Sequence, residues 1–377
     1  MKIRSPTTYG LRVCRPMPID VVESAAQFEP LRDVWESVYD SDSQAQVFAS
    51  WAWIRAYLPV TRRRPFILCY RPAKEASHVA FLPLAIDGFP RRRPLLNRDL
   101  YPFQHPHGDY AGLLARPEHE DAALQAFSAF LTDERWDNFH AHDLCDARMN
   151  TLLESFSADR LRTVTLAETK CPYIPLPATW EDYLRTRLHK HFRHDLRRSI
   201  RLVETLPEFR AELIDRDNVE LIVDLTLQYA QSRYRNSPRY RREQRALLLN
   251  CFQSGCLIGM GLWTGTSLLA TVIAFVDGRG RELYAYKTAF NPAFAKYSPG
   301  TVVAGFMIRY AIENGFKIYD FSRGGERYKS LFGTALRYTR HHTLTRSGAR
   351  AAIGNAIRPF VRAPGRVAEK LWSRVPT

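Results

Sequence analysis

The sequence predicts a mixed α/β (α+β) protein built from two parts. At 377 residues the chain is too long for one ordinary hydrophobic core and suits two domains. Short runs rich in Val, Ile, Leu and aromatic residues alternate with amphipathic stretches along its length, which indicates strands and helices packed in layers. An apolar content of 45% and a charged content of 25% are ordinary for a folded globular chain.

The first half of the chain reads as one α/β unit. Helical patterns cover residues 25–38 and 51–58, and Ser50 is placed to cap the second helix. Strand-like runs lie at 66–70, 79–86 and 110–114, followed by a helix at 120–131, a strand at 138–142 and a helix at 149–156. We therefore assign residues 20–165 to a first domain.

The second half begins with a Pro-rich stretch at 171–177, which reads as an extended connector because each Pro disfavours helix in the residue before it. Thr179 then caps a long helix. Its apolar stripe recurs every fourth residue, at Leu184, Leu188, Phe192, Leu196 and Ile200, while arginines fill its other faces. A helix at 218–232 and a basic, Tyr-containing segment at 233–245 follow.

The remaining elements of this half alternate in type. They read as strands at 257–263, 268–276 and 282–290, a loop at 291–300, a helix at 301–314, a strand at 316–321, a short helix at 326–332 and a strand at 336–345. We assign residues 166–348 to a second domain. Residues 349–377 form a basic tail with six Lys and Arg residues against Glu369.

One uncharged stretch, residues 254–276, is long enough to cross a bilayer. A turn-like Thr264-Gly265-Thr266-Ser267 interrupts it, and its flanks are rich in β-branched and aromatic residues. Two antiparallel strands explain it better than a membrane span. The N-terminal residues have no apolar core segment of a signal peptide, and the six scattered cysteines read as reduced thiols, so we expect a cytoplasmic protein.

The charge of the chain is uneven. Residues 1–165 hold 20 Lys and Arg against 21 Asp and Glu, whereas residues 166–377 hold 34 against 18. The basic excess therefore belongs to the second half. Such a field favours an anionic partner, for example a phosphorylated cofactor, RNA, an acidic glycan or a lipid surface.

The most informative segment is 282–333, where a strand runs through an irregular loop into an apolar helix. Ser298 suits the N-cap, Pro299 the first helical position, and Gly300 lets a ligand approach the backbone. The first amides of a helix lack internal partners and bind anions, and Lys296 adds a positive charge. Helix capping alone also explains this sequence.

The same segment closely resembles the CelD/BcsL group of GNAT-like acetyltransferases, which is associated with cellulose and exopolysaccharide synthesis. The matching residues are the hairpin with LLATVIAF, the Tyr284–Tyr286 strand, Asn291-Pro292 with Ser298-Pro299-Gly300, and Tyr319-Asp320-Phe321 through Arg323-Gly324 to Glu326, Tyr328 and Lys329. Weaker matches, Phe48-x-Ser50-x-x-Trp53 and the Arg-rich helix 185–201, extend the likeness over residues 45–345.

The resemblance implies tandem GNAT-like domains, as in FemABX-type transferases, with mixed, mainly antiparallel sheets flanked by helices. The first half is then degenerate and the second holds the cleft. It implies that acetyl-CoA or another acyl-CoA is the donor, with Tyr297, Ser298, Gly300 and Thr301 lining its pyrophosphate beside Lys296. The acceptor is a small molecule or glycan, sugar-derived or amino, and the polysaccharide synthesis machinery is a partner.

Four residues near the end of the strand after the helix are the catalytic candidates. Acyl transfer from a thioester needs removal of one proton, stabilisation of an oxyanion and a proton for the thiolate. Asp320 or Glu326 could be the base or its orienter, Arg323 could bind an acidic acceptor or steady Asp320, and Tyr328 could be the acid. Equally, Asp320 and Arg323 could form a structural ion pair while Tyr328 packs.

Three other functions were weighed on particular features. His105-Pro106-His107-Gly108-Asp109 and His140-Ala141-His142-Asp143 are tempting metal strings, but they lack companion ligands downstream, so we expect no metal. The basic second half would suit aminoacyl-tRNA as donor in an alternative, FemABX-like function; otherwise we expect no nucleic-acid partner. A non-catalytic accessory of a polysaccharide synthase, held at the membrane surface by the tail 349–377, is the third function.

Overall fold

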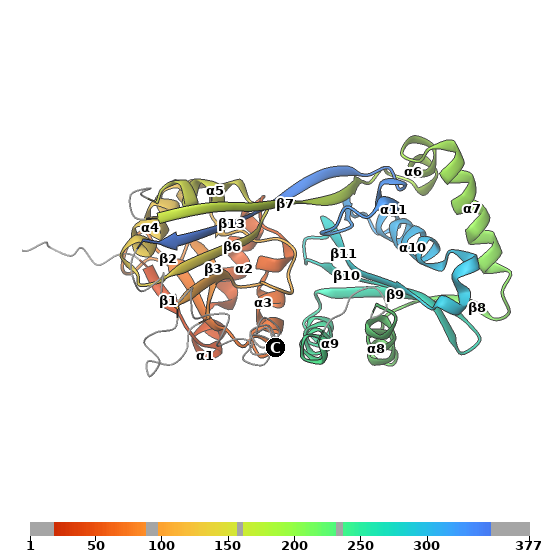
Figure 1. The fold of residues 1–377 in the computed structure, drawn as a ribbon, viewed down its shortest axis with the longest axis horizontal. Coiled ribbons are helices and arrows are strands. Elements are labelled where there is room, and N and C mark those ends of the chain that lie inside the picture. Colours follow the sequence, from red (N-terminus) through yellow and green to blue (C-terminus); the bar gives the residue numbers. More distant parts are fainter. Residues whose placement is uncertain (1–18, 88–96, 157–160, 231–236, 348–377) are drawn as a thin grey trace, which may run out of the picture.

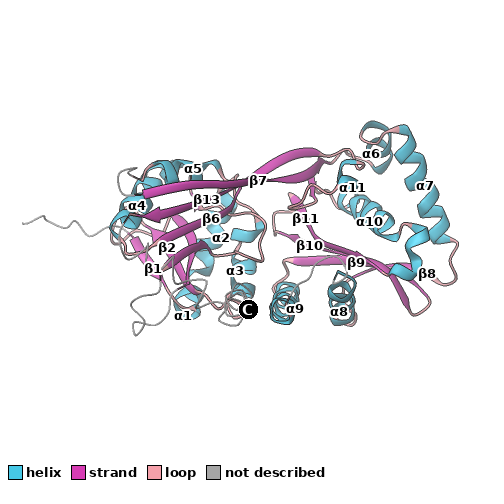
Figure 2. Ribbon diagram, viewed as in Figure 1, coloured by secondary structure: helices cyan, strands magenta, loops and turns pink. Residues whose placement is uncertain are grey.

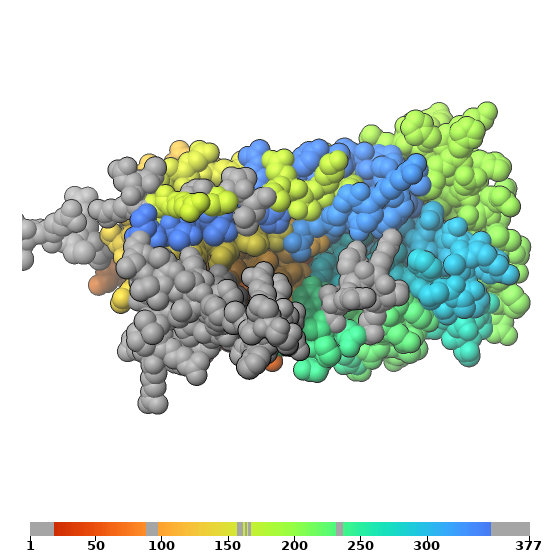
Figure 3. Space-filling view, in the orientation of Figure 1, coloured from red at the N-terminus to blue at the C-terminus, as the bar shows by residue number. Residues whose placement is uncertain are grey.

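The two halves of the chain lie side by side and share one sheet (Figure 1). The computed structural model describes residues 19–87, 97–156, 161–230 and 237–347. Two long strands, β7 (Leu161–Pro175) and β13 (Ala335–Arg346), pair along their whole length and run across both halves. In the space-filling view they form a continuous band over the molecule (Figure 3).

The first half packs helices against the strands that lead to this band. Its helices are α1 (Ala25–Phe28), α2 (Arg32–Ser41), α3 (Trp51–Tyr57), α4 (Glu120–Asp133) and α5 (Ala147–Glu154). Its strands are β1 (Ile19–Val22), β2 (Arg64–Tyr70), β3 (Ala80–Asp87), β4 (Asp99–Pro102), β5 (Leu114–Ala115) and β6 (Asn138–Leu144). The Ser50 hydroxyl accepts a hydrogen bond from the Trp53 amide, which confirms the predicted cap of α3.

The second half has helices on both faces of its strands (Figure 2). Its helices are α6 (Trp180–Thr186), α7 (Lys190–Glu204), α8 (Val219–Ala230), α9 (Pro238–Gln253), α10 (Pro299–Glu313) and α11 (Arg327–Ser330). Its strands are β8 (Phe209–Leu213), β9 (Leu257–Thr264), β10 (Ser267–Val276), β11 (Glu282–Phe290) and β12 (Ile318–Asp320). A 3-10 helix, η4 (Pro292–Tyr297), precedes α10.

The described strands form a 13-stranded, mainly antiparallel sheet in the order β1-β2-β3-β4-β6-β13-β7-β12-β11-β10-β9-β8, with β5 beside β3. The last described strand, β13, pairs with β6 of the first half and with β7. The expected boundary between residues 165 and 166 falls inside β7. The sheet therefore continues from one half into the other.

Among the described residues, three large hydrophobic clusters and a small one around Trp263 stabilise this arrangement, and one of the large clusters belongs to both halves. It joins Trp35, Phe48 and Trp53 of the first half to Phe275 and Tyr284 of the second. Another lies between β9–β11 and the helices α6, α7 and α10, and the third lies between the first-half strands and α4 and α5. Because the shared cluster is fully buried, the two halves are packed as one body.

Several predicted elements differ from the structure. The expected strand at 110–114 is reduced to β5, the expected helix at 25–38 is broken into α1, a 3-10 turn and α2, and the long helix after Thr179 is split into α6 and α7. The connector at 171–177 is largely the end of β7. The strands β1, β4 and β8, the first part of β7 and the helix α9 were not predicted. Tertiary pairing, which local sequence does not encode, decides these short segments.

The uncharged stretch at 254–276 forms the antiparallel hairpin β9–β10, as predicted. No helix in the described part of the chain has the length and apolarity to span a bilayer. The five described cysteines are unpaired thiols. The tail 349–377 and residues 233–236 of the basic segment lie outside the described residues.

Candidate active site

The sheet of the second half splits between β11 and β12. These parallel strands pair only at Glu282, Leu283 and Tyr284, which face Ile318, Tyr319 and Asp320. Beyond Tyr284, β11 continues for six residues with β10 on one side and no described strand on the other. Backbone groups along that edge are free for an extended ligand, which could add as a strand.

This open edge of β11 leads into the start of α10. The capping signals in the sequence are only partly realised there: Ser298 adopts a left-handed conformation (φ 50°) and its side chain makes no capping hydrogen bond. The Ser298 carbonyl instead accepts hydrogen bonds from the backbone amides of Thr301 (3.0 Å) and Val302 (3.1 Å). The expectation of several free amides is therefore wrong, and among the described contacts only the Gly300 amide lacks an acceptor.

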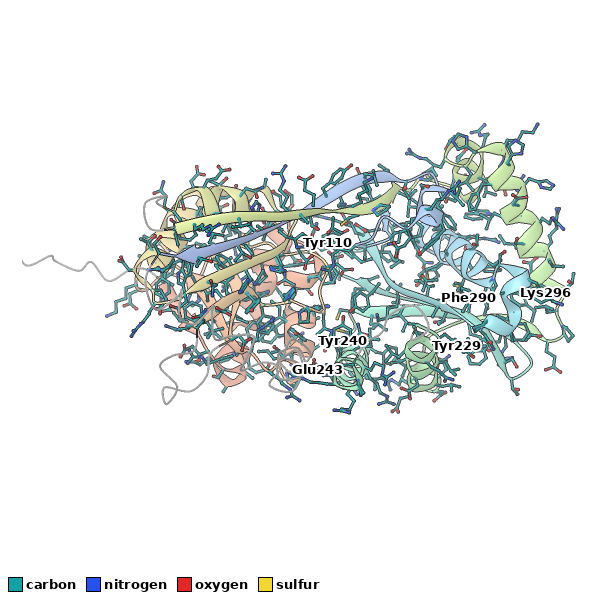
Figure 4. All side chains as sticks on the ribbon, in the orientation of Figure 1. Tyr110, Tyr229, Tyr240, Glu243, Phe290 and Lys296 are labelled. Atoms are coloured by element: carbon teal, nitrogen blue, oxygen red, sulfur yellow. The ribbon has the colours of Figure 1, made fainter. Side chains whose placement is uncertain are left out.

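The turn before α10 is nevertheless open to solvent. Lys296 and Ser298 are exposed, Tyr297 is half-buried, and the Lys296 ammonium lies 4.9 Å from the centre of the Tyr297 ring. Phe290, at the end of β11, lies against Gly300: a Cβ at Gly300 would come within 3.3 Å of its ring. Figure 4 shows Phe290 and Lys296 at this end of the second half. The predicted donor residues thus gather around one accessible helix start.

Asp320 lies at the other end of the split and is completely buried. Its carboxylate accepts hydrogen bonds from the Tyr110 hydroxyl (2.9 Å) and the Ser322 amide (2.5 Å), and Arg337 Nε lies 3.4 Å away. Burial raises the pKa of Asp320 to about 6, although Arg337 opposes that rise. The residue holds the two halves together and has no exposed oxygen.

Arg323 does not pair with Asp320, so the structural ion pair considered from the sequence is wrong. Its guanidinium instead donates to Asp109 (2.6 Å) and Asp143 (2.6 Å), both in the first half. Burial works against its charge, but the two carboxylates outweigh burial and raise the pKa of Arg323. Arg323 bridges the halves in the same way as Asp320 does.

Glu326 and Tyr328 lie on the loop and helix after Arg323. Glu326 pairs with the buried ammonium of Lys329 at 2.9 Å. Lys329 Nζ also donates to the carbonyls of Phe321, Arg323 and Gly324 at 3.0–3.1 Å. Tyr328 packs beside Phe321. Lys329 thereby fixes the loop that carries Arg323.

The structure adds Lys287, which is next to Tyr286 on β11 and was not selected from the sequence. The register between β10 and β11 shifts so that Ile273 faces Lys287 and Ala274 faces Ala285, which leaves Tyr286 as the extra residue of a β-bulge. Ile273 belongs to the core shared with the first half, and partners directly opposite share a face. Tyr286 packs against that same core, so both side chains lie on the side of the sheet that faces the first half.

These residues belong to a polar interface between the halves, which we call the seam: loop 105–109, α9 and the bulge of β11. Tyr286 accepts a hydrogen bond from Gln244 at 3.2 Å, and the Tyr240 ring stacks on His107 at 4.6 Å. His107 Nε2 lies 3.6 Å from Glu243. Figure 4 shows Tyr240 and Glu243 on α9 in this region, with Tyr110 also between the halves. A bulge cannot be read from sequence, but Tyr286 ends the Tyr284–Tyr286 strand that carries the resemblance, and Lys287 follows it directly.

The two histidine strings meet near Arg323 without forming a metal centre. His105 stacks on Tyr101 and lies edge-on to His142, while Asp143 is bound by Arg323. Across the described residues no group of three or more His, Cys, Asp or Glu side chains is placed to hold a metal ion. In the structure these side chains contact each other and Arg323.

A second feature lies between the halves, next to the buried Asp320. It is a pocket of about 260 Å³ lined by first-half residues including Gln44, Gln46 and Cys145, and by Glu282 and Arg337 of the second half. Arg337 pairs with Glu282 at 3.3 Å, so the charges that face the pocket are partly neutralised. Tyr110 lines the pocket and also contacts Asp320.

Comparison with known proteins locates a recognised domain over this site. Residues 190–330 match the family model for the acetyltransferase (GNAT) domain. The fold is similar to the crystal structure of FemX, with a TM-score of 0.60 and 11% identity over 82% of this chain and 95% of that chain. It is also similar to a conserved protein of unknown function from Bacteroides thetaiotaomicron, with a TM-score of 0.54 and 10% identity over 87% and 99% of the two chains.

No curated protein matches the chain by sequence. At 10–11% identity the structural likenesses concern the fold alone. Together with the domain match they confirm the predicted tandem GNAT-like fold with its mixed, mainly antiparallel sheet. The matched domain spans the split strands, the start of α10 and the loop after Asp320.

Proposed function

We propose that the chain, with its GNAT acetyltransferase domain at 190–330, transfers an acyl group from acetyl-CoA or another acyl-CoA to a sugar-derived or amino acceptor. The observation that carries this proposal is the split between β11 and β12, which leads from the buried Asp320 to the open start of α10. Donor and acceptor would meet at the point where the two strands part.

The donor fits the geometry of the open strand edge. From Tyr284 to Phe290 the strand covers roughly 20 Å, six residues at about 3.3 Å each. The arm between the diphosphate and the sulfur of coenzyme A is extended and carries two amides, which can pair with a free strand edge. Its diphosphate would then reach the Gly300 amide and the exposed Lys296. When bound, acyl-CoA supplies an activated thioester.

The acceptor would approach from the seam. The α10 side of the sheet is filled by the apolar cluster that contains Ala285, whereas the seam side presents Tyr286, Lys287 and the loop 105–109. Polar side chains there can orient a hydroxyl or an amine. Asp320 and Arg323 keep a positioning role in this proposal, because each is held by residues of the first half.

Isothermal titration with coenzyme A tests the donor site. Gly300→Asp places a carboxylate beside the proposed diphosphate, and we expect affinity to fall by about tenfold or more, which corresponds to roughly 1.4 kcal/mol. Gly300→Asn is the matched control, since it meets the same Phe290 ring without a charge. An Asp in the first turn favours the helix dipole, so unfolding would not explain a loss of binding. Equal affinity in all three proteins eliminates this turn as the donor site.

The acceptor class rests on the likeness to the polysaccharide-associated group. We infer that the acceptor is a sugar or amino sugar unit used in cellulose or exopolysaccharide synthesis, inside the cytoplasm. Thiol release from acetyl-CoA in the presence of amino sugars, neutral glycans or free amino acids tests this class. If amino acids are acylated and none of the sugars is, the polysaccharide role is excluded, whereas the proposal of acyl transfer still stands.

A second candidate donor, aminoacyl-tRNA, is favoured by the outer face of α7. Lys190, Arg198 and Arg201 are exposed on this helix and form no ion pair with a described residue. A nucleic-acid backbone would supply the missing anions. Filter binding of labelled tRNA, compared with a Lys190→Ala, Arg198→Ala, Arg201→Ala variant, tests it. Salt-insensitive or absent retention of tRNA rules this donor out.

The membrane-surface accessory remains a third proposal, because the tail lies outside the described residues. Vesicle sedimentation of the full chain and of a chain that ends at residue 348 tests it. If the full chain sediments with vesicles and the shortened chain does not, and if the full chain releases no thiol from acetyl-CoA, the results favour an accessory over an enzyme.

A further inference from the structure

We propose that Lys287 is the general base of the reaction and removes the proton from the attacking amine or hydroxyl of the acceptor. This inference rests on the proposed acyl transfer and deepens it. Lys287 was not among the catalytic candidates from the sequence, because Asp320, Arg323, Glu326 and Tyr328 match the family motif and Lys287 does not.

The position of Lys287 follows from the bulge in β11. Without the shift at Tyr286, strict alternation would turn residue 287 toward the α10 side of the sheet. The bulge places Lys287 opposite Ile273, on the seam side. It lies three residues past Tyr284, where the pairing with β12 ends. Its amine is thereby placed beside the split, on the seam side of the sheet.

The surroundings of Lys287 leave its amine available. Nζ lies 5.0 Å from the centre of the Tyr286 ring and makes no hydrogen bond or ion pair with a described residue. Asp109 is near enough to attract it, but that carboxylate is held by Arg323 at 2.6 Å. The nearest other titratable groups of the seam are His105 and His107 in loop 105–109 and Tyr240 and Glu243 on α9; burial lowers the pKa of His105.

The surroundings bring the pKa of Lys287 close to physiological pH, so that a fraction of the protein carries this lysine as the neutral amine. Burial lowers the pKa of this lysine to about 8, and Asp109 only partly opposes the effect. Burial also lowers the pKa of His107 to about 4, so His107 adds no positive charge at neutral pH. A base whose pKa lies close to the working pH is the most effective proton acceptor.

The carboxylates near the split are less suited to this task. Asp320 is fully buried and already accepts from Tyr110 and Ser322, and Glu326 is paired with Lys329. Asp109 and Asp143 are both engaged by Arg323. Unlike these carboxylates, Lys287 makes no hydrogen bond or ion pair with a described residue, so the lone pair of its neutral amine is available.

Lys287 and the bound thioester account for every proton and electron pair in the acyl-transfer step. The acceptor nitrogen or oxygen forms a bond to the thioester carbonyl carbon, and its proton moves to Nζ of Lys287. The carbon–sulfur bond breaks, and its electron pair leaves with the sulfur as a thiolate. The ammonium of Lys287 can return the proton to this thiolate or to water, since a thiol has a similar pKa of about 8.5.

Two substitutions distinguish whether Lys287 acts as a general base or only as a positive charge that binds a ligand. Lys287→Arg keeps the charge but cannot release its proton at working pH, while Lys287→Met removes both functions. We expect both variants to bind coenzyme A as the wild type does and to lose about 10²- to 10⁴-fold in kcat for thiol release from acetyl-CoA with glucosamine. Lys317→Met, an exposed lysine at the start of β12, is the matched control and keeps full kcat.

The pH profile gives the second readout. Because the neutral amine is the active form, wild-type kcat should rise with pH and level off above about 8, and both variants should lack this limb. Competitive acetic anhydride labelling of the wild type, followed by mass spectrometry, should show Lys287 titrating near the same pH. Full activity in Lys287→Arg, or labelling with the midpoint of an exposed lysine, overturns the inference. A wild type that does not bind coenzyme A instead overturns the proposed function.

Discussion

The Tyr110 hydroxyl lies 2.9 Å from both carboxylate oxygens of Asp320 and so joins residues 210 positions apart in the chain. One residue comes from the first half and the other from the end of β12, at the point where the sheet splits. Asp320 has no exposed surface, so this contact, together with Arg337 and the Ser322 amide, replaces its hydration. The half that was expected to be degenerate thus contributes directly to the candidate site.

Asp320 should make the stability of the protein depend on pH. Burial raises its pKa from 3.8 to about 6, so between these values the folded state binds more protons than the unfolded state. The free energy of unfolding should therefore decrease from pH 4 to pH 7, by about 3 kcal/mol for this group alone. Urea titrations of the wild type and Asp320→Asn at each pH measure the difference.

The Asp320→Asn protein keeps an acceptor for Tyr110 and has nothing to titrate. Its stability relative to the wild type should increase from pH 4 to pH 7. A difference between the two proteins that stays constant over this range would show that Asp320 titrates as an ordinary exposed carboxyl does.

We expect the loss of Arg323 to lower the stability of the folded protein, and not only its activity. Its removal leaves Asp109 and Asp143 with unpaired charges, and their side chains are 8% and 2% exposed. We expect Arg323→Met to lose about 3–5 kcal/mol of unfolding free energy, as is usual when one partner of a buried ion pair is removed. Arg323→Lys should lose part of this, because an ammonium cannot bind both carboxylates in the same fork.

Chemical denaturation of both variants provides the measurement. If Arg323→Met unfolds like the wild type but loses turnover, then Arg323 acts on the acceptor, as the sequence motif suggested, and the bridge contributes little.

Lys329 should hold the loop between β12 and α11 in place. Its ammonium is buried and donates to three backbone carbonyls, of Phe321, Arg323 and Gly324. Lys329→Met leaves these carbonyls unsatisfied and should cost about 1–3 kcal/mol. Limited proteolysis should then cleave the chain near residues 321–326 faster than in Arg327→Met, whose side chain is exposed on the same helix. Equal cleavage rates in the two variants would contradict this role.

The cap at Ser50 gives a local test of the first half. Its hydroxyl accepts from the Trp53 amide at 3.3 Å and donates to the Val47 carbonyl at 2.6 Å. Ser50→Ala should lower the free energy of unfolding by about 1 kcal/mol. Ser50→Thr keeps the hydroxyl and should recover most of that loss, as thermal unfolding of the three proteins would show. No loss in Ser50→Ala would mean that water satisfies the Trp53 amide equally well.

Local patterns were sufficient for elements with a strong period or a clear cap. Strand β11 has the predicted bounds, the hairpin β9–β10 and helix α10 differ from prediction by two residues at most, and Thr179 caps α6 through the Asp182 amide. The apolar stripe from Leu184 to Ile200 correctly predicted which face is buried. It did not predict that the helix is interrupted: α6 ends at Thr186 and α7 begins at Lys190. Periodicity reports which face is buried and does not report such a break.

The candidate site depended on long-range contacts to a greater extent. Motif residues located the start of α10 and the end of β12 correctly. However, the amides of Thr301 and Val302, which were expected to be free, donate hydrogen bonds to the Ser298 carbonyl. The partners of Arg323 could not be read from sequence, since Asp109 and Asp143 lie 214 and 180 residues away. No local signal connects residues at that separation.

By itself the sequence determined the class of fold, the basic second half and the strand–loop–helix segment in which the candidate site lies, since hydrophobic period and turn chemistry act over a few residues. The tertiary structure alone decided that β7 and β13 join both halves in one sheet, that Tyr110 meets Asp320, and that a bulge directs Lys287 to the seam. Strand register and burial are set by the whole packed chain, and they fix which side chains face each other and what charge they carry.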